Sequence, residues 1–157
     1  MASPRDYKNT IIPNWCSGCG DYGIQNAISA VCAKKGWANE DITLISGIGC
    51  SSRIGGYQYC YGAHTTHGRA LPFAQGIKCA NKDTHMIVCS GDGDSYAIGL
   101  GHAMHAMKRN MDITYLVFDN QVYGLTKGQT SPASSQGFVT KTTPDGNPMT
   151  PLDAPSM

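Results

Sequence analysis

The sequence predicts an α/β fold with a mainly parallel β-sheet and helices on both faces. Two observations lead to this prediction. Short apolar runs rich in β-branched residues alternate with stretches whose apolar residues recur at helical spacing. Most glycines are clustered, in segments such as GIGCSSRIGG and SGDGD that follow the apolar runs. Strands that alternate with helices build βαβ units, and such units form parallel sheets that helices cover on both sides.

Length and composition narrow the function classes. The chain has 157 residues, which are enough for a single domain with a substantial core. A net charge of +1 with 15% charged residues gives no indication of a nucleic-acid or membrane-surface partner. No apolar run approaches the roughly 20 residues of a membrane span, and the start, MASPRDYKNT, has no signal-peptide core. We therefore expect a soluble, cytoplasmic protein.

The first half of the chain predicts one helix and one strand. The helix is expected over residues 19–36, with Asp21 near its start and Gly36 just beyond its end, as the helix dipole and the C-cap favour. The run DITLISG at 41–47 predicts the first strand. A glycine-rich loop follows this strand as far as Gly68.

The second half of the chain predicts a further helix and then a βαβ unit. The helix is expected over residues 68–81, where Pro72 fits only in the first turn. The run HMIVCS at 85–90 predicts the second strand, residues 95–110 the helix after it, and DITYLVFDN at 112–120 the third strand.

The last residues have a different composition. Residues 129–157 contain many Pro, Ser and Thr residues and no periodic apolar pattern, which predicts an extended or disordered segment. Three strands make a thin sheet for so glycine-rich a chain. We expect residues 1–157 to form a single domain that is incomplete at its C-terminus.

The motif GDGD begins where the second predicted strand ends. Asp92 ends that strand and Asn120 ends the third, so a right-handed crossover between neighbouring strands brings both to one edge of the sheet. Oxygen ligands suit Mg²⁺, and the loop NQVYG adds the carbonyl of Val122. Gly93 and Asp94 open the next helix, where N–H groups and the helix dipole favour an anion. A lone GDG is also typical of tight turns, but this spacing favours a Mg²⁺–diphosphate site.

Clustered cysteines indicate metal or redox chemistry, because disulfides are rare in the cytoplasm. Cys16 and Cys19 form WCSGCG, and Cys50 lies in GIGCSSR. Three thiolates are one fewer than iron–sulfur clusters usually have, and CxxC alone is equally typical of half a zinc site or of a redox pair. The other cysteines are expected to be small buried hydrophobic residues. They are Cys32, Cys60, Cys79 and Cys89.

Two further side chains are candidates for acting on a substrate. Arg53 follows Cys50 on the glycine-rich loop, and a guanidinium can bind a carboxylate through two hydrogen bonds. A structural ion pair is the alternative for this residue. His67, in THGR, could transfer protons or stabilise charge, or it could instead cap the following helix.

The chain resembles the β subunit of 2-oxoacid:ferredoxin oxidoreductases, most closely the 2-oxoglutarate branch. The resemblance extends from about residue 11 to residue 153 and rests on six collinear segments: WCSGCGDYGI, SGIGCSSR, HGRALPFAQGIK, GDGD with IG after it, H-x-x-H-x-x-x-RN, and DITYLVFDNQVYGLTKGQTSP. It implies a thiamine-diphosphate-binding fold. It also implies oxidative decarboxylation of a 2-oxoacid with coenzyme A, in which electrons pass through a 4Fe–4S cluster to ferredoxin.

The resemblance implies roles for the residues of the predicted diphosphate site. Asp92, Asn120 and the carbonyl of Val122 would hold Mg²⁺. Gly93 would let the backbone reach the phosphates, and Asp94 would cap the helix beside them. The residues lining thiamine diphosphate would be Ile48, Gly49, Cys50, Ser51, Gly93, Asp94, Gly124 and Leu125.

The resemblance also implies what this chain needs from elsewhere. Cys16, Cys19 and Cys50 would ligate the 4Fe–4S cluster, whose fourth cysteine lies in a C-terminal part absent here. The glutamate that activates the thiamine ring belongs to the α subunit in this family, and the only glutamate here, Glu40, lies in a predicted turn. We therefore expect activity only in an αβ heterodimer or a pair of them.

Two other function classes stay open. A thiamine-dependent decarboxylase or synthase without redox output would keep Asp92 and Asn120 but would not need the three clustered cysteines. A non-catalytic module would bind a structural zinc ion at those cysteines. The motifs favour 2-oxoglutarate as the substrate, although other 2-oxoacids share most of the same residues.

Overall fold

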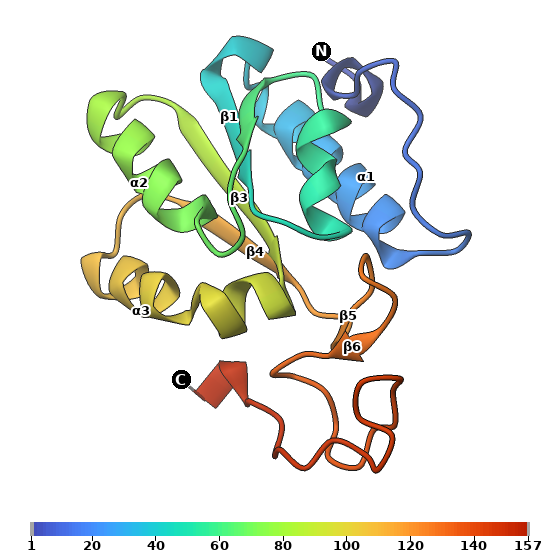
Figure 1. Cartoon of the computed structure of the whole chain (residues 1–157). Helices are drawn as coiled ribbons and strands as arrows, with labels where there is room; N and C mark the ends of the chain where they lie inside the picture. Colours follow the sequence, from blue (N-terminus) through green and yellow to red (C-terminus); the bar gives the residue numbers. More distant parts are fainter. Residues whose placement is uncertain (1, 157) are drawn as a thin grey trace.

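A single parallel sheet forms the centre of the molecule, in a computed structural model that describes residues 2–156. The strand order is β2-β1-β3-β4, and every neighbouring pair is parallel (Figure 1). This sheet confirms the α/β prediction. The strands are β1 (Ile42–Ser46), β2 (Tyr61–His64), β3 (His85–Gly91) and β4 (Thr114–Phe118).

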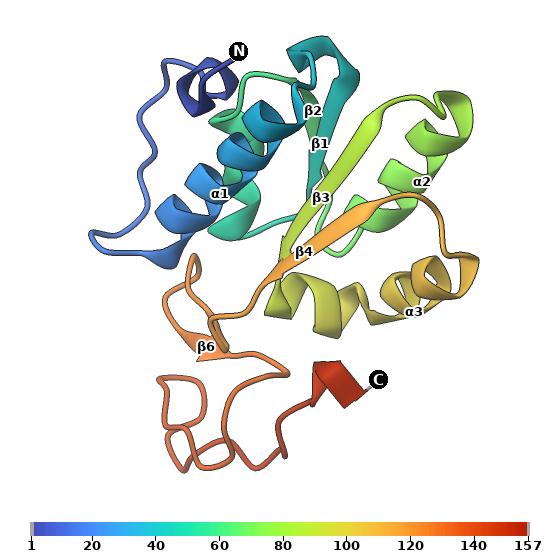
Figure 2. The same cartoon turned by 180° about the vertical axis from the view of Figure 1, so that it is seen from behind.

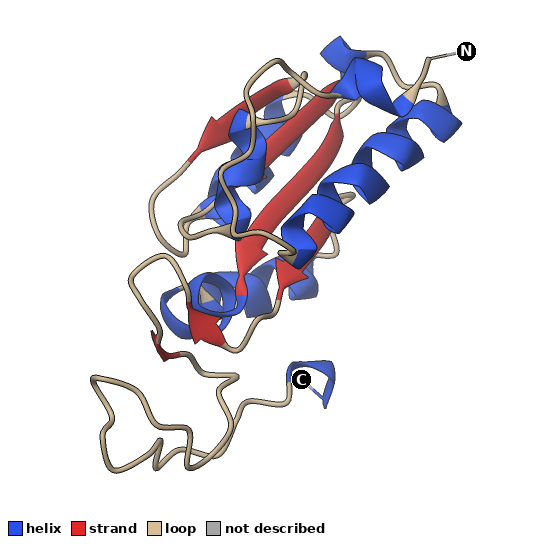
Figure 3. Ribbon diagram, turned by 90° about the vertical axis from the view of Figure 1, so that its right-hand side faces the viewer, coloured by secondary structure: helices blue, strands red, loops and turns tan. Residues whose placement is uncertain are grey.

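Helices cover both faces of the sheet, as Figures 2 and 3 show. On one face, α1 (Gly20–Lys35), the short helix η3 (Ser51–Gly56) and the N-terminal turn η1 (Pro4–Tyr7) enclose one apolar cluster. On the other face, α2 (Ala70–Ala80) and α3 (Leu100–Arg109) enclose a second cluster. Successive side chains of a strand point to opposite faces, so β1 and β3 contribute alternate residues to both clusters.

The predicted helices and strands are present, and three strands were missed: β2 and the two short strands of a hairpin within residues 122–130. α1 ends where Gly36 adopts a left-handed conformation, with a φ of +68°, as the sequence predicted. The strand missed in the main sheet is β2, whose sequence YGAH contains no β-branched residue. A Cβ on Gly62 would lie 2.5 Å from the carbonyl oxygen of Leu44 in β1. The glycine that weakens the strand signal is therefore the residue that lets β2 approach β1.

The helix predicted over residues 95–110 begins differently. A π-helical turn, η4 (Asp94–Ile98), precedes α3, and Gly99 joins the two. The hydroxyl of Ser95 donates to the carbonyl of Gly91 at 2.7 Å, which ties the turn to the end of β3. Single π-turns within helices often occur at functional sites.

The chain beyond β4 forms a hairpin and then a largely irregular segment. The strands β5 (Val122–Tyr123) and β6 (Gln129–Thr130) pair in antiparallel fashion. Figures 1 and 2 place this hairpin and the segment after it below the carboxyl ends of β3 and β4. A short 3₁₀ turn, η5 (Ala154–Ser156), ends the described chain. Asn147 is buried, and its amide donates to the carbonyls of Ser134 and Ser135, so polar contacts define this path.

The cysteines outside the predicted cluster differ in burial. Cys32 and Cys89 are buried, as predicted, and Cys60 is half-buried. Cys79 is exposed, so the prediction of burial was wrong for this residue: it lies on the outward face of α2. All seven cysteines are free thiols. Within residues 2–156, the helices are too short or too polar to cross a membrane.

Gly62→Ala tests the close approach of β2 to β1. The added Cβ would meet the Leu44 carbonyl, a backbone atom, so we expect a loss of about 1–3 kcal/mol in the free energy of unfolding, measured in urea. Gly101→Ala in α3 is the control, because its added Cβ meets no atom within 4 Å and should stabilise the helix by up to about 1 kcal/mol. Equal stabilities for the two variants would contradict the packing described here.

Candidate functional site

The site lies where the chain changes direction across the sheet. From β1 the chain passes to β2 at one edge, whereas from β3 it passes to β4 at the other edge. Open α/β sheets bind ligands at such a switch point, outside the carboxyl ends of the strands. Residues 47–50 leave β1 there, and residues 92–94 leave β3 beside them.

Asp92 is a buried carboxylate that pairs with no basic side chain in the described part of the chain. It is 2% exposed, and its Oδ2 accepts a hydrogen bond from the hydroxyl of Ser131. Burial raises the pKa of Asp92, the hydrogen bond from Ser131 opposes this effect, and the charge of Asp119 adds to it. Within the described residues, no Lys, Arg or His forms an ion pair with Asp92. A buried carboxylate of this kind fits a site for a hard divalent cation.

The other predicted magnesium ligands follow β4: Asn120 lies on the loop and Val122 begins β5. Asn120 is exposed, and its Oδ1 accepts a hydrogen bond from the N–H of Val122 at 3.1 Å. A Cβ on Gly124 would lie 3.5 Å from Nδ2 of Asn120 and 3.6 Å from Sγ of Cys50. The structure therefore brings this loop beside the glycine-rich loop after β1.

Tyr123 covers the turn that contains Gly93. A Cβ on Gly93 would lie 2.2 Å from the Tyr123 ring, so only glycine fits there. The hydroxyl of Tyr123 donates to the carbonyl of Gly93 at 3.2 Å. The sequence prediction included neither Tyr123 nor Ser131, although both stand in the segment DNQVYGLTKGQTSP that carried the resemblance.

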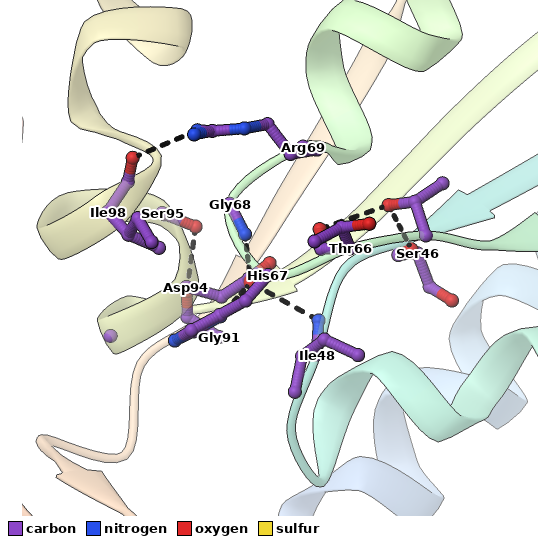
Figure 4. A network of polar contacts seen from close by, with 12 residues as sticks. Ser46, Ile48, Thr66, His67, Gly68, Arg69, Gly91, Asp94, Ser95 and Ile98 are labelled. Carbon is purple, nitrogen blue, oxygen red and sulfur yellow. Dashed lines mark hydrogen bonds and ion pairs between the residues drawn. The ribbon is translucent and has the colours of Figure 1, made fainter.

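Asp94 joins three loops through one oxygen atom, as Figure 4 shows. Its Oδ1 accepts hydrogen bonds from the N–H of Ile48 at 3.2 Å and of Gly68 at 2.7 Å, and lies 2.5 Å from Nδ1 of His67. It forms no hydrogen bond that caps a helix, so the predicted capping role was wrong. The physical reason is that the carboxylate points across the sheet edge to the two other loops.

The two candidate catalytic residues differ in their surroundings. The side chain of His67 is 35% exposed and lies edge-on to Tyr123, with ring centroids 6.2 Å apart. It contacts Asp94 rather than the start of α2, where no side chain caps the helix. Arg53 is exposed, and its Nε donates to the hydroxyl of Tyr57 at 3.1 Å. Within residues 2–156 Arg53 forms no ion pair, so its charge is free for a ligand.

The remaining residues predicted to line the cofactor lie after β1 and in the hairpin of β5 and β6. Gly49 has a φ of +123°, a conformation that favours glycine. Ser51 is buried, and its Oγ lies 3.2 Å from the position of a Cβ on Gly91. Leu125 is exposed on the hairpin between β5 and β6.

The three clustered cysteines lie in one region without forming a closed metal site. Cys16 and Cys19 precede α1, and Nε1 of Trp15 donates to the carbonyl of Cys50 at 2.7 Å. Burial raises the pKa of Cys50, and the charges of Asp21, Cys16 and Cys19 raise it further. However, no three His, Cys, Asp or Glu side chains in the described part of the chain gather closely enough to hold a metal ion. As they stand, the three thiols do not fit a complete cluster site.

Comparison with known proteins identifies a domain family and several relatives. Residues 47–156 match the family model of the thiamine pyrophosphate enzyme C-terminal TPP-binding domain. The 2-oxoglutarate oxidoreductase subunit KorB of Mycobacterium tuberculosis is 48% identical over 143 residues, which are 91% of this chain and 38% of that protein. The 2-oxoglutarate synthase subunit KorB of Archaeoglobus fulgidus is 45% identical over 154 residues, which are 97% of this chain and 57% of that protein.

A solved structure has the same fold. It is the 2-oxoglutarate:ferredoxin oxidoreductase from Magnetococcus marinus with 2-oxoglutarate, coenzyme A and succinyl-CoA bound. The TM-score is 0.96 at 42% sequence identity, and the match covers 98% of this chain and 53% of that chain. The chain thus spans only about half the length of the relatives that it matches. These comparisons confirm the family resemblance predicted from the motifs.

Asp92→Asn tests whether the buried carboxylate is an unpaired charge. The amide oxygen can still accept the Ser131 hydrogen bond, so in EDTA at pH 7 we expect the variant to be more stable than the wild type by about 1–3 kcal/mol. Urea unfolding measures this difference. Mg²⁺ with thiamine diphosphate should then stabilise only the wild type.

The control for this comparison is Asp83→Asn, which removes a negative charge from an exposed turn. We expect it to change the stability by less than about 0.5 kcal/mol. If Asp92→Asn is instead less stable than the wild type in EDTA, other groups compensate the negative charge of Asp92, and the prediction is wrong.

Proposed function

Because the chain belongs to the thiamine pyrophosphate enzymes, through their C-terminal TPP-binding domain, we propose that it forms part of a 2-oxoacid:ferredoxin oxidoreductase β subunit. Its role is to bind the diphosphate end of thiamine diphosphate together with Mg²⁺. One observation carries this proposal: Asp92 is buried at the switch point of the sheet, and no basic side chain among the described residues pairs with it. A diphosphate with its magnesium ion supplies the cation that this position requires.

Residues of this chain would hold and orient the cofactor. Asp92, Asn120 and the carbonyl of Val122 would bind Mg²⁺, and the N–H groups of Gly93 and Asp94 would face the phosphates. When bound, thiamine diphosphate supplies the nucleophilic carbon at which a 2-oxoacid loses CO₂. The same turn would exclude water, because Tyr123 lies against Gly93.

Two side chains would act on the substrate. Arg53 would bind the distal carboxylate of 2-oxoglutarate, since its guanidinium is exposed and oriented by Tyr57. His67 would hold or transfer a proton beside the cofactor, since its ring is partly exposed next to Tyr123.

We also propose that Cys16, Cys19 and Cys50 bind a 4Fe–4S cluster that passes electrons to ferredoxin. The three thiols lie close enough together for Cys16 and Cys19 to raise the pKa of Cys50, which supports this proposal. Three thiols are one fewer than such clusters usually have, so this proposal includes a further ligand from outside the described residues. The open arrangement is also the observation that favours the alternative, a thiamine-dependent decarboxylase or synthase without redox output.

The complete enzyme would need an α subunit. Relatives of this chain are named as subunits, which supports a partner. Glu40, the only glutamate of the chain, is exposed in η2 (Asn39–Asp41) and stands before β1 rather than after it, so it does not belong to the loops of the site. We propose that the α subunit supplies the activating glutamate and that the complex works in the cytoplasm, where free thiols persist.

The proposed activity is tested in the assembled enzyme. The full-length gene is co-expressed anaerobically with its α partner, and coenzyme A-dependent viologen reduction is measured with 2-oxoglutarate and with pyruvate. We expect faster reduction with 2-oxoglutarate. Asp92→Asn should lower the activity by at least about a hundredfold, since even outer-shell partners of metal ligands often matter that much. Full activity in this variant would contradict the magnesium assignment.

Cys16→Ala tests the cluster separately from thiamine binding, because Cys16 is not among the residues expected to line the cofactor. We expect the variant complex to lose iron, acid-labile sulfide and brown colour while it still binds thiamine diphosphate. Cys79→Ala is the matched control, because this thiol is exposed on α2 and should leave the iron content unchanged. A colourless wild-type complex that releases CO₂ from a 2-oxoacid would instead favour the non-redox alternative.

A further inference from the structure

Asp94 is buried where three segments meet, and its side chain is enclosed. The residue is 2% exposed, and Oδ1 receives the backbone N–H groups of Ile48 and Gly68 together with Nδ1 of His67. Oδ2 faces Gly47, where a Cβ would lie only 1.7 Å away, and it has no hydrogen-bond partner among the described residues. The carboxylate therefore presents neither oxygen to a ligand from outside.

These contacts determine which nitrogen of His67 carries hydrogen. Backbone N–H groups can only donate, so Oδ1 acts as the acceptor in this cluster. The hydrogen between His67 and Asp94 then belongs to Nδ1. In a neutral imidazole the other nitrogen, Nε2, is left as a bare acceptor. Asp94 thus selects one tautomer of the imidazole.

The rest of the imidazole lies beside the turn that contains Gly93. The ring packs edge-on against Tyr123, and Tyr123 lies against Gly93. Nδ1 is turned inward to Asp94, while the side chain as a whole is 35% exposed. Within residues 2–156, Nε2 forms no hydrogen bond, so it is the nitrogen that a ligand can use.

We propose that Asp94 is a positioning residue for His67. It holds the imidazole in the Nδ1–H tautomer, so that Nε2 serves as a hydrogen-bond acceptor toward the bound cofactor and substrate. The backbone N–H of Asp94 can still face the phosphates, but its carboxylate binds neither phosphate nor metal. The identity of the ligand rests on the proposed function, whereas the tautomer does not.

The tautomer is tested directly in the chain without cofactor. Histidine is labelled with ¹⁵N, a long-range ¹H–¹⁵N correlation spectrum is recorded, and the signals of His67 are identified from their absence in His67→Asn. We expect a protonated Nδ1 and a bare Nε2. In Asp94→Asn we expect a mixture of tautomers, because an amide can both accept and donate. An Nε2–H tautomer in the wild type would overturn the proposal.

Two variants test the consequence in the assembled αβ complex. Asp94→Asn keeps an oxygen for the N–H groups of Ile48 and Gly68, and His67→Asn keeps an N–H donor for Asp94 but has no Nε2. We expect both to bind thiamine diphosphate with Mg²⁺ within about threefold of the wild type, while kcat falls by about a hundredfold and KM changes little. Asp83→Asn, the exposed control, should match the wild type in both measurements.

Distinct results would overturn the inference and the proposed function. If Asp94→Asn loses thiamine diphosphate as severely as Asp92→Asn, Asp94 is a cofactor ligand and the inference is wrong. If His67→Asn retains the wild-type kcat, His67 only supports Asp94, and the inference is wrong again. A wild-type complex inactive with every 2-oxoacid would overturn the proposed function and leave the tautomer result valid. If Asp94→Asn does not fold, the wild-type tautomer and His67→Asn decide.

Discussion

The site depends on the close approach of the loop after β1 to the turn after β3. The pairing of the two strands continues beyond β1, since the N–H of Gly47 donates to the carbonyl of Cys89 at 3.2 Å. The side chain of Asp94 then occupies the space that any Cβ on Gly47 would need. Because of this contact, the N–H of Ile48 reaches the Asp94 carboxylate, and the glycine-rich loop is fixed relative to the strand that carries Asp92.

Much of the fold could be predicted from the sequence, because local patterns determine it. The apolar runs gave β1, β3 and β4, and the helical periods gave α1 and α2 with nearly correct bounds. β2 was missed because its pairing with β1 depends on Gly62, and glycine is not typical of strand sequences. The π-helical turn before α3 was not predicted. It involves a contact of Ser95 with the end of β3, and the spacing of apolar residues carries no information about such a contact.

The candidate site was predictable to a smaller extent. The spacing of Asp92 and Asn120 predicted that both residues follow the carboxyl ends of neighbouring parallel strands, and β3 and β4 are such a pair. The direction of the Asp94 side chain could not be predicted, because its partners lie 26 and 46 positions away along the chain. Ser131 was missed for a related reason: its segment has the composition of a solvated loop, yet it is buried against Asp92.

The hydrogen bond from Ser131 to Asp92 has a thermodynamic consequence for the segment after β6. The hydroxyl of Ser134 donates to the carbonyl of Gln121, so the same segment is also tied to the loop that carries Asn120 and Val122. A cation that binds at Asp92 changes the acceptor on which Ser131 depends, and linkage requires the reverse effect to be equally large. Binding of the proposed cation at Asp92 and the ordering of the irregular segment would therefore be coupled: a cation that favours the ordered path would itself bind more tightly when that path is restrained.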